Sequence, residues 1–305
     1  MKSLIIGGSG FLGSHVVDKL LADGAQVRVY DRASERYRRT PAAVDFRQGD
    51  FTDTNSLAEA LVDVDVVFHM LSTSVPSTSN QDPVADIQGN LIGTVRLLEL
   101  MRSSGVRRMV FLSSGGTVYG PPQMDPVPES HPERPISSYG IVKSAIEKYL
   151  LMEQHLHGLR PTILRVSNPY GPRQGHGGVQ GVIGTFLWRI AQAEPIQIWG
   201  DGSIVRDFIH VDDLARLCIG CATQEICGVF NAGSGQGVSI NEVLDVIRAV
   251  TGHDVQPDYK PGRGFDVPRV VLDIAAARRD FAWEPRVALL SGLAETWEWV
   301  KGQVK

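Results

Sequence analysis

Hydrophobic residues along the first half of the chain follow two alternating patterns. Short apolar runs have the length of buried strands, and they lie at residues 4–6, 26–30, 44–46, 64–69, 108–112 and 160–166. Between most of these runs, apolar residues recur with the period of a helix, at residues 11–21, 54–61, 82–103 and 137–156. Strands that alternate with helices at this spacing predict a parallel sheet covered by helices on both faces.

The pattern changes after Asn168, where glycine and proline residues punctuate shorter elements. Helices are expected at 179–193, from a Ser239 cap to Val250, and at 288–300. We therefore predict an α/β fold, a Rossmann-type doubly wound parallel sheet with a smaller α/β substrate lobe. The dinucleotide-binding domain is expected to comprise residues 1–167 with 207–234 returning to it, and the substrate-binding lobe residues 168–206 and 235–305.

A glycine-rich segment joins the first predicted strand to the first predicted helix. Gly7, Gly10 and Gly13 follow the apolar run at 4–6 and precede the helical pattern that begins near Phe11. Glycines at this spacing let the backbone turn sharply and approach a pyrophosphate, while the helix points its first amides at the phosphates. The spacing alone also arises by chance, so the prediction depends on the strand before it and the helix after it.

Carboxylates follow the second and third predicted strands. Asp31 lies 18 residues past Gly13, where a carboxylate accepts hydrogen bonds from the ribose hydroxyls of NAD and repels the 2′-phosphate of NADP. Asp50 ends the third strand, from where it can bond the adenine amine, although an ordinary loop carboxylate is the alternative. A hydroxyl-rich loop at 70–79 opens at the same edge of the sheet. These features predict NAD as the cofactor.

Tyr139 and Lys143 are four residues apart in the predicted helix 137–156, so they share one helical face. A free tyrosine titrates at about 10, but a nearby ammonium group and a positive nicotinamide ring both favour the phenolate. Tyr139 is therefore expected to take a proton from a sugar hydroxyl while the carbon beneath gives hydride to NAD. The residues expected to bind the cofactor are Gly7, Gly10, Phe11, Leu12, Asp31, Arg32, Asp50, Phe51, Leu71, Tyr139 and Lys143.

Composition excludes several classes of function. The chain has 305 residues, of which 43% are hydrophobic, and this is enough for a full globular core. A net charge of −4 without a basic run predicts no nucleic-acid partner and no membrane partner. The arginines at 32, 36, 38 and 39 are interpreted as a solvated loop, with a contact to the adenine side of a cofactor as the alternative. No apolar stretch has the length of a signal peptide or a membrane span, so a cytoplasmic location is expected.

Cysteines and histidines give no sign of metal chemistry. The three cysteines, a number typical of a reducing compartment, are Cys218, Cys221 and Cys227. The first two lie three apart on the apolar face of a helical pattern, so we expect inert core thiols. The histidines at 69, 176 and 210 lack the spacing of metal ligands and are expected to be structural, and we predict no metal site.

The chain resembles the extended short-chain dehydrogenase/reductases, in particular the sugar-nucleotide epimerase/dehydratase group. The motifs that carry the resemblance cover essentially the whole chain, and they are the glycine loop, Asp31, Gly49-Asp50, Tyr139-x-x-x-Lys143, residues 168–173 and residues 206–211. The resemblance implies bound NAD and a nucleotide diphosphate sugar, with a UDP-sugar favoured, in the cleft between the lobes. It also implies a homodimer formed through helices 82–103 and 137–156, whose apolar faces can equally be core.

The same resemblance implies four substrate-binding residues. Arg206 and Arg263 match family positions whose guanidinium groups hold the diphosphate by bidentate, charge-assisted bonds. Asn168 matches a residue that bonds a sugar hydroxyl or phosphate, and Asp266 one that bonds the nucleoside ribose.

One position departs from the family pattern. Relatives of UDP-galactose 4-epimerase carry Ser or Thr four residues before the tyrosine of Val-Tyr-Gly, where this chain has Gly115. The hydroxyl that bonds the reacting sugar is then expected from Ser114 or Thr117, with Ser114 favoured. The 4,6-dehydratases and decarboxylases of the family place a carboxylate before Val-Tyr-Gly, and this chain does not. We therefore predict an NAD-dependent enzyme that inverts C4 of a nucleotide diphosphate sugar through a 4-keto intermediate.

Two alternatives stay open at this point. The first is an NAD(P)H-dependent reductase or synthase that acts on a 4-keto sugar nucleotide, and it differs from an epimerase in consuming added cofactor. The second is a non-catalytic protein that binds NAD or a sugar nucleotide. It is considered because Gly115 replaces the Ser or Thr of the family. Conversion of any sugar nucleotide by the purified protein would exclude the second.

Overall fold

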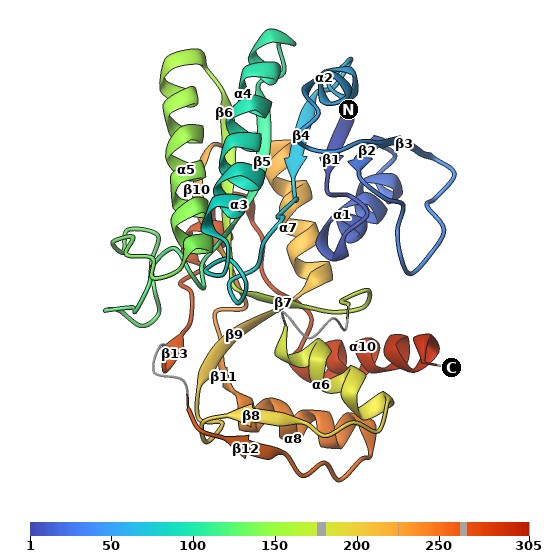
Figure 1. Cartoon of the computed structure of the whole chain (residues 1–305), viewed down its shortest axis with the longest axis vertical. Coiled ribbons are helices and arrows are strands. Elements are labelled where there is room, and N and C mark those ends of the chain that lie inside the picture. The colour runs from blue at the N-terminus through green and yellow to red at the C-terminus, as the bar shows by residue number, and fades with distance from the viewer. Residues whose placement is uncertain (176–180, 225, 263–266, 305) are drawn as a thin grey trace.

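A parallel sheet of seven strands forms the larger part of the molecule in this computed structural model, which describes residues 1–175, 181–224, 226–262 and 267–304 (Figure 1). The strand order is β10-β6-β5-β4-β1-β2-β3. The strands are β1 (Lys2–Ile6), β2 (Gln26–Asp31), β3 (Val44–Gln48), β4 (Val66–His69), β5 (Arg108–Ser114), β6 (Arg160–Val166) and β10 (Gly228–Ala232). The doubly wound α/β fold predicted from the sequence is confirmed.

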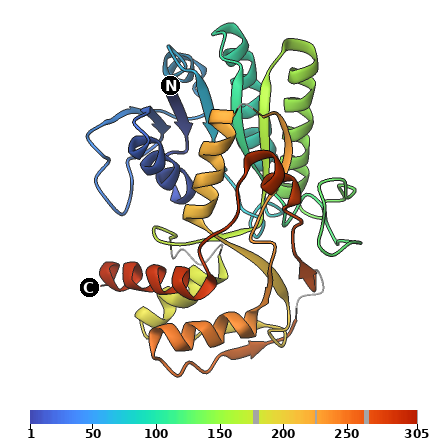
Figure 2. The ribbon, with the colours of Figure 1, turned by 180° about the vertical axis from the view of Figure 1, so that it is seen from behind.

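Helices cover both faces of this sheet, because alternate residues of each strand point to opposite sides. Ile5 of β1 packs in one apolar cluster, with residues of α1 (Phe11–Ala22) and α7 (Val211–Gln224). Leu4 and Ile6 pack in the other cluster, on the face covered by the helices α2 (Thr54–Ala60), α4 (Gly93–Ser103) and α5 (Ser138–His157). Figure 2 shows α1 and α7 together on the first face. Burial on both faces explains why the inner strands appear in the sequence as continuous apolar runs.

Two parts of the sheet domain differ from the prediction. The helix expected at 82–103 is not uniform, because α3 (Pro83–Asp86) passes into a π-helix, η1 (Ile87–Ile92), before α4 begins. In addition, the sheet has seven strands and not the six expected from the first half of the chain, because β10 of the returning segment pairs in parallel with β6. β10 lies more than 60 residues after β6 in the sequence, so the local pattern around β6 does not reveal that the two strands pair.

The smaller lobe contains two further sheets and three helices. Its four-stranded sheet comprises β7 (Asn168–Tyr170), β9 (Val205–His210), β11 (Gly237–Ser239) and β13 (Arg269–Val270). Its two-stranded sheet pairs β8 (Gln197–Trp199) with β12 (Asp258–Lys260). The helices are α6 (Val182–Ala191), α8 (Ile240–Thr251) and α10 (Leu289–Gln303). Ser239 caps α8 as predicted, and Glu242 completes a capping box.

The chain crosses between the lobes more often than the sequence suggested. Strand β9 belongs to the smaller sheet, whereas α7 and β10 return to the larger one. The helix α9 (Ala275–Phe281) was expected in the smaller lobe, but it packs against β10, and the rings of Phe281 and Phe230 lie 4.9 Å apart. Trp283 also donates from Nε1 to Asp213 O of α7 (3.0 Å). Residues 275–283 therefore complete the core of the larger lobe.

The cysteines of α7 are core side chains. Cys218 and Cys221 are fully buried, and burial raises the pKa of the Cys218 thiol to about 12 and that of Cys221 well above its usual range. Both thiols therefore stay protonated at neutral pH, as predicted for inert thiols. Among residues 1–175, 181–224, 226–262 and 267–304, none of the helices combines the length and the apolar character needed to span a membrane.

Candidate functional site

The carboxyl ends of the strands β1, β4, β5 and β6 open into a cavity of about 430 Å³. Residues of the segment after β6 close the other side of this cavity, so it lies between the two lobes. Ligands of open α/β sheets bind at this edge. The predicted site residues that line the cavity are Gly7, Gly10, Phe11, Leu12, Ser114, Tyr139, Lys143 and Asn168.

The glycine loop is folded too tightly for side chains. Gly7 has φ +81°, and a Cβ there would lie 2.9 Å from the Leu71 backbone. A Cβ on Gly13 would lie 2.3 Å from Gly7 O. Gly10 is the N-cap of α1 and supplies no side-chain cap, so the first amides of the helix are left to a ligand. This backbone cradle fits the pyrophosphate of a dinucleotide.

A second cavity, of about 30 Å³, lies beside the first and is lined by the residues expected to hold the adenosine end of the cofactor, namely Asp31, Arg32, Asp50, Phe51 and Leu71. The Asp31 carboxylate accepts a hydrogen bond from Ser9 N (3.0 Å), so the glycine loop fixes its position. Asp50 accepts from Thr52 N (2.9 Å) and Thr52 Oγ1 (2.7 Å), and these bonds lower the pKa of its carboxyl group. A fixed carboxylate at the end of β2 fits the ribose of NAD.

Tyr139 and Lys143 project into the larger cavity from the first turns of α5, which is capped by Ser137. The Lys143 Nζ lies 5.6 Å from the centroid of the Tyr139 ring. Nζ donates to Leu112 O (2.8 Å) and lies 4.7 Å from the centroid of the Phe111 ring. The end of β5 therefore holds the ammonium group of Lys143 in place.

The pKa values of this pair differ from the sequence expectation. Burial raises the pKa of Tyr139 to about 12, although a hydrogen bond with Ser72 acts in the opposite direction. Burial also lowers the pKa of Lys143 to about 8. The ammonium group alone therefore does not make the phenol acidic, because both side chains are desolvated and Nζ is directed at a backbone carbonyl. The other expected source of acidity is the positively charged ring of NAD.

The geometry distinguishes the two candidate hydroxyl groups. Ser114 lines the cavity with Tyr139 and Lys143, whereas Thr117 is not among the lining residues. The Thr117 Oγ1 is buried, and among the described residues it has no hydrogen-bond partner. A Cβ on Gly115 would lie 2.6 Å from Leu272 Cδ1 and 3.0 Å from Arg165 O. A serine at position 115 would therefore require the Leu272 side chain to move and would lie close to the Arg165 carbonyl.

A further cavity, of about 250 Å³, lies in the smaller lobe and shares Asn168, Pro169 and Gln174 with the larger one. Arg206 lines it and donates from Nη1 to Val267 O (2.7 Å). Asn168 donates from Nδ2 to Asp207 O (2.9 Å). The structure thus brings two of the four predicted substrate residues to the cavity of the smaller lobe, while Arg263 and Asp266 lie outside the described residues.

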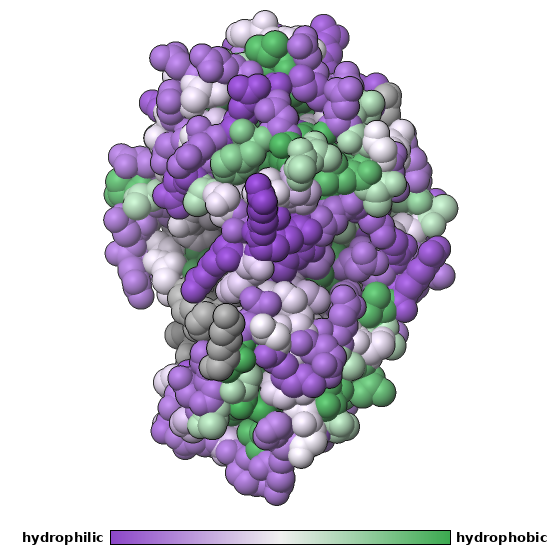
Figure 3. Space-filling model, turned by 90° about the vertical axis from the view of Figure 1, so that its right-hand side faces the viewer, coloured by the Kyte–Doolittle hydropathy of each residue, from purple (hydrophilic) through white to green (hydrophobic). Residues whose placement is uncertain are grey.

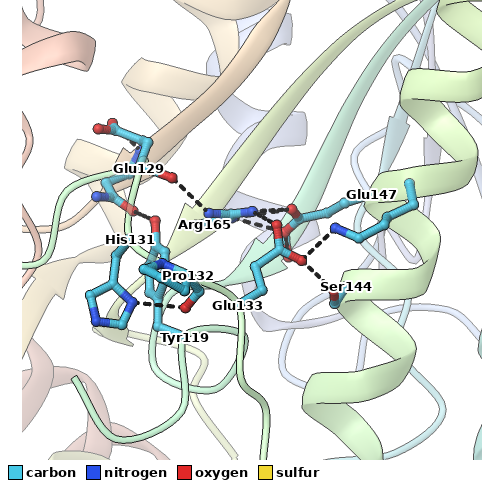
Figure 4. Close-up of polar contacts among 11 residues, drawn as sticks. Tyr119, Glu129, His131, Pro132, Glu133, Ser144, Glu147 and Arg165 are labelled. Atoms are coloured by element: carbon cyan, nitrogen blue, oxygen red, sulfur yellow. Dashed lines mark hydrogen bonds and ion pairs between the residues drawn. The ribbon is translucent and has the colours of Figure 1, made fainter. Parts of the chain in front are cut away.

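A buried ionic network behind the cavity was not predicted (Figure 4). Arg165 of β6 and Glu147 of α5 are 3% and 1% exposed, and Arg165 Nη2 lies 2.6 Å from Glu147 Oε2. Arg165 also pairs with Glu133 (2.5 Å), and its Cζ lies 4.8 Å from the centroid of the Tyr119 ring. Ser113, which lines the cavity, donates to Glu147. Two features of the sequence could have revealed this network. Arg165 is a charged residue inside an apolar strand, and Glu147 lies on the same helix face as Tyr139.

The arginine-rich loop after β2 is only partly solvated. Arg38 pairs with Asp18 of α1 and with Glu35, and Arg173 also pairs with Asp18 (2.8 Å). Tyr37 extends to the smaller lobe, where its ring packs against aromatic rings of α6 and α10, 6.4 Å from Trp188 and 5.0 Å from Trp299. This side of the molecule is mostly hydrophilic (Figure 3). The loop therefore connects the two lobes, in addition to carrying exposed arginines.

Replacing Tyr37 with alanine is expected to lower the free energy of unfolding by about 2 kcal/mol, because aromatic packing between the lobes is lost. The Tyr37 hydroxyl has no hydrogen-bond partner among the described residues, so Tyr37→Phe is expected to be neutral. The exposed Arg39→Ala serves as a control in the same loop. Urea unfolding measures all three, and equal losses in Tyr37→Phe and Tyr37→Ala would contradict the packing argument.

The histidines predicted to be structural are buried where the structure describes them. His69 hydrogen-bonds Thr94 Oγ1 (2.8 Å), and burial lowers its pKa to about 3. His210 is 2% exposed and packs against the Tyr170 ring (5.3 Å), whereas His176 lies outside the described residues. Within the part of the chain that the structure describes, no group of three or more His, Cys, Asp or Glu side chains is arranged to hold a metal ion.

The fold and this site define a dinucleotide-binding protein of the Rossmann class. The model of the NAD dependent epimerase/dehydratase family matches residues 3–233. A UDP-glucose 4-epimerase of Mycolicibacterium smegmatis is 36% identical over 313 residues, covering 99% of both chains. The chain belongs to the NAD dependent epimerase/dehydratase family, and its cofactor is NAD.

Solved structures agree with this assignment over the full length. A UDP-glucose 4-epimerase of Thermotoga maritima with UDP-glucose superposes with a TM-score of 0.94 at 36% identity, covering 100% of both chains. A Thermus thermophilus UDP-glucose 4-epimerase in complex with NAD gives a TM-score of 0.92 at 34% identity, again covering 100% of both chains.

Proposed function

We propose that this protein is an NAD-dependent epimerase that inverts C4 of a nucleotide diphosphate sugar, with a UDP-sugar as the favoured substrate. The observation that carries the proposal is that two cavities share lining residues. One holds the glycine loop with Tyr139 and Lys143, and the other, in the smaller lobe, has Asn168 in common with it. A sugar nucleotide that spans both cavities has its sugar beside Tyr139. The UDP-sugar specificity of the relatives supports the same substrate class.

In the proposed mechanism Tyr139 is the general base. NAD, held by the glycine loop and Asp31, would supply the hydride acceptor and donor for C4, and its positive ring would favour the phenolate. The Tyr139 oxygen takes the proton of the 4-hydroxyl group and gives it back when the keto group is reduced on its other face. Ser114 lies in the same cavity and is assigned the hydrogen bond to the reacting oxygen. Lys143, fixed at Leu112 O, keeps a positive charge beside Tyr139.

The substrate contacts remain proposals for individual residues. Asn168 is assigned to a sugar hydroxyl or phosphate and Arg206 to the diphosphate, because both line the cavity of the smaller lobe. Arg263 and Asp266 keep the roles that the family resemblance implies, the diphosphate and the ribose respectively.

Incubation of the purified protein with UDP-glucose and, separately, with UDP-galactose tests this function. The expected result is the same equilibrium mixture from both directions, read by chromatography, without added reduced cofactor. A panel of UDP, dTDP, GDP and CDP sugars identifies the base and the sugar. Product that forms only as added NAD(P)H is oxidised would indicate the reductase instead. Absence of any product would indicate a binding protein.

We also propose a homodimer formed through α4 and α5. The face of α5 opposite the sheet carries four partly or largely exposed apolar residues, Ile141, Tyr149, Met152 and Leu156. Exposed apolar side chains gathered on one face of a helix are typical of a protein interface.

Replacing Met152 with arginine is expected to shift the protein from dimer to monomer in sedimentation velocity, since a charge in an apolar interface loses its hydration without a partner. Val62→Arg places the same charge on an exposed apolar residue after α2 and is expected to leave the dimer intact. A monomeric wild type, or equal dissociation by both variants, would contradict this interface.

A further inference from the structure

A buried carboxylate lies behind the Tyr139 cavity and has no part in the mechanism above. Asp86 ends α3 and is only 2% exposed. Its Oδ1 accepts hydrogen bonds from Ser74 Oγ (2.7 Å) and Asn90 Nδ2 (2.8 Å). Its Oδ2 accepts from Ser138 Oγ (2.7 Å). One carboxylate thus joins three segments of the chain.

The first segment is the hydroxyl-rich loop 72–80, part of which lines the cavity. Asn90 Oδ1 accepts from Thr73 N (2.8 Å), so Asp86 and Asn90 together hold two consecutive loop residues, Thr73 and Ser74. The preceding residue, Ser72, hydrogen-bonds the Tyr139 side chain. The position of the Ser72 hydroxyl relative to the phenol therefore depends on this anchor.

The second segment is the N-terminus of α5. Ser138, which bonds Asp86, directly precedes Tyr139 in the chain. The far end of the loop is tied to the same place, because Tyr139 N donates to Ser79 Oγ (3.1 Å) and Ser138 N to Asn80 Oδ1 (2.8 Å). Both ends of the loop are therefore fixed to the turn that carries the proposed base.

The third segment is the π-helix η1, which begins immediately after Asp86. Short π-helical turns inside α-helices occur frequently at functional sites. Asn90 lies in this turn, and so does Gly89, where a Cβ would lie 2.6 Å from Thr73 Oγ1. The π-helical turn thus places the Asn90 amide, and the side-chain-free Gly89, where the loop 72–80 contacts η1.

We propose that Asp86 is a positioning residue of the reaction, which holds the loop 72–80 against the start of α5 and so fixes Ser72 and Tyr139 relative to one another. This inference rests on the proposed function. Asp86 acts electrostatically on Tyr139 and Lys143 of α5, whereas the loop 72–80 and η1 carry no titratable group. Burial dominates both pKa values, and the charge of Asp86 raises each of them.

Asp86→Ala is expected to lower kcat on the order of 10–100-fold, as a small misplacement of reacting groups does, while the KM for the sugar nucleotide and the bound NAD stay unchanged. Asp82→Ala is the matched control, because Asp82 lies four residues earlier, is exposed and only caps α3 through Ala85 N (3.0 Å). This control is expected to keep the wild-type kcat.

Asp86→Asn separates positioning from simple support of the fold. The substitution preserves shape and removes the negative charge, so the phenolate forms at lower pH and the acid limb of the kcat profile moves to lower pH. A residue that only stabilises the fold would leave that limb where it is. An unshifted limb together with wild-type kcat in both Asp86 variants would overturn the inference.

Hydrogen exchange of the loop amides gives a readout that does not depend on turnover. Asp86→Ala is expected to speed exchange at residues 72–80 relative to wild type, and Asp82→Ala is not. If the wild type converts no sugar nucleotide, the proposed function fails, and the exchange rates alone decide whether Asp86 anchors the loop. Equal exchange in both variants would refute the anchor.

Discussion

Replacing Tyr139 with phenylalanine is expected to lower kcat by about 10³-fold while the protein still binds NAD. The variant loses only the phenolic oxygen, and a positioned general base contributes typically about 10²–10⁴-fold to a rate. The ring itself still packs beside Lys143 and keeps the shape of the cavity. Conversion of the sugar nucleotide measures kcat, and release of cofactor from the denatured variant measures its NAD content.

A matched control lies on the same helix. Tyr149→Phe removes a hydroxyl group from α5 at an exposed position and is expected to leave kcat unchanged. Wild-type turnover in Tyr139→Phe would remove Tyr139 from the mechanism. Loss of NAD together with turnover would show that the side chain supports the fold of the site instead of the proton transfer.

The acidity of Tyr139 gives this prediction a pH dependence. Burial raises the pKa of the phenol to about 12 in the protein without cofactor, so at neutral pH the side chain is protonated. The positive ring of NAD favours the phenolate and lowers this pKa in the holoenzyme. Because the phenolate is the active form in the proposed mechanism, kcat is expected to fall as the pH drops below the pKa of Tyr139 in the holoenzyme. In the proposed mechanism the positive ring of NAD, more than Lys143, therefore favours the phenolate form of Tyr139.

The sequence predicts the site well where the local pattern and the topology act together. Parallel strands place all their carboxyl ends at one edge, so the glycine loop after β1, Ser114 after β5 and Tyr139 at the start of α5 were expected to meet. The structure brings all three to one cavity. Their exact roles stay predictions, because the cavity alone does not show which group moves a proton.

Other features depend on contacts between distant residues and have no local signal. The helical period of 82–103 is kept through η1, so the π-turn that places Asn90 is not visible in the pattern. Tyr37 looks like part of a solvated arginine loop until the aromatic rings of the smaller lobe are placed beside it. The pairing of Arg165 with Glu147 has no local signal either, although a charge at each of these otherwise buried positions is unusual in the sequence.

The Arg165–Glu147 pair is expected to show a large coupling in a double-mutant cycle. Glu147→Leu leaves a buried guanidinium with fewer partners, and Arg165→Met leaves a buried carboxylate, so each single variant is expected to lose about 3–5 kcal/mol of unfolding free energy. The double variant removes both charges, and its loss is expected to be about 2–3 kcal/mol smaller than the sum of the single losses.

Urea unfolding at neutral pH measures this cycle, and Glu147→Gln supplies a milder variant if Glu147→Leu does not fold. The exposed pair Lys301–Glu298 is the control, because its side chains are 46% and 71% exposed and surface pairs contribute at most about 1 kcal/mol. A coupling near zero at Arg165–Glu147 would show that neither charge depends on the other.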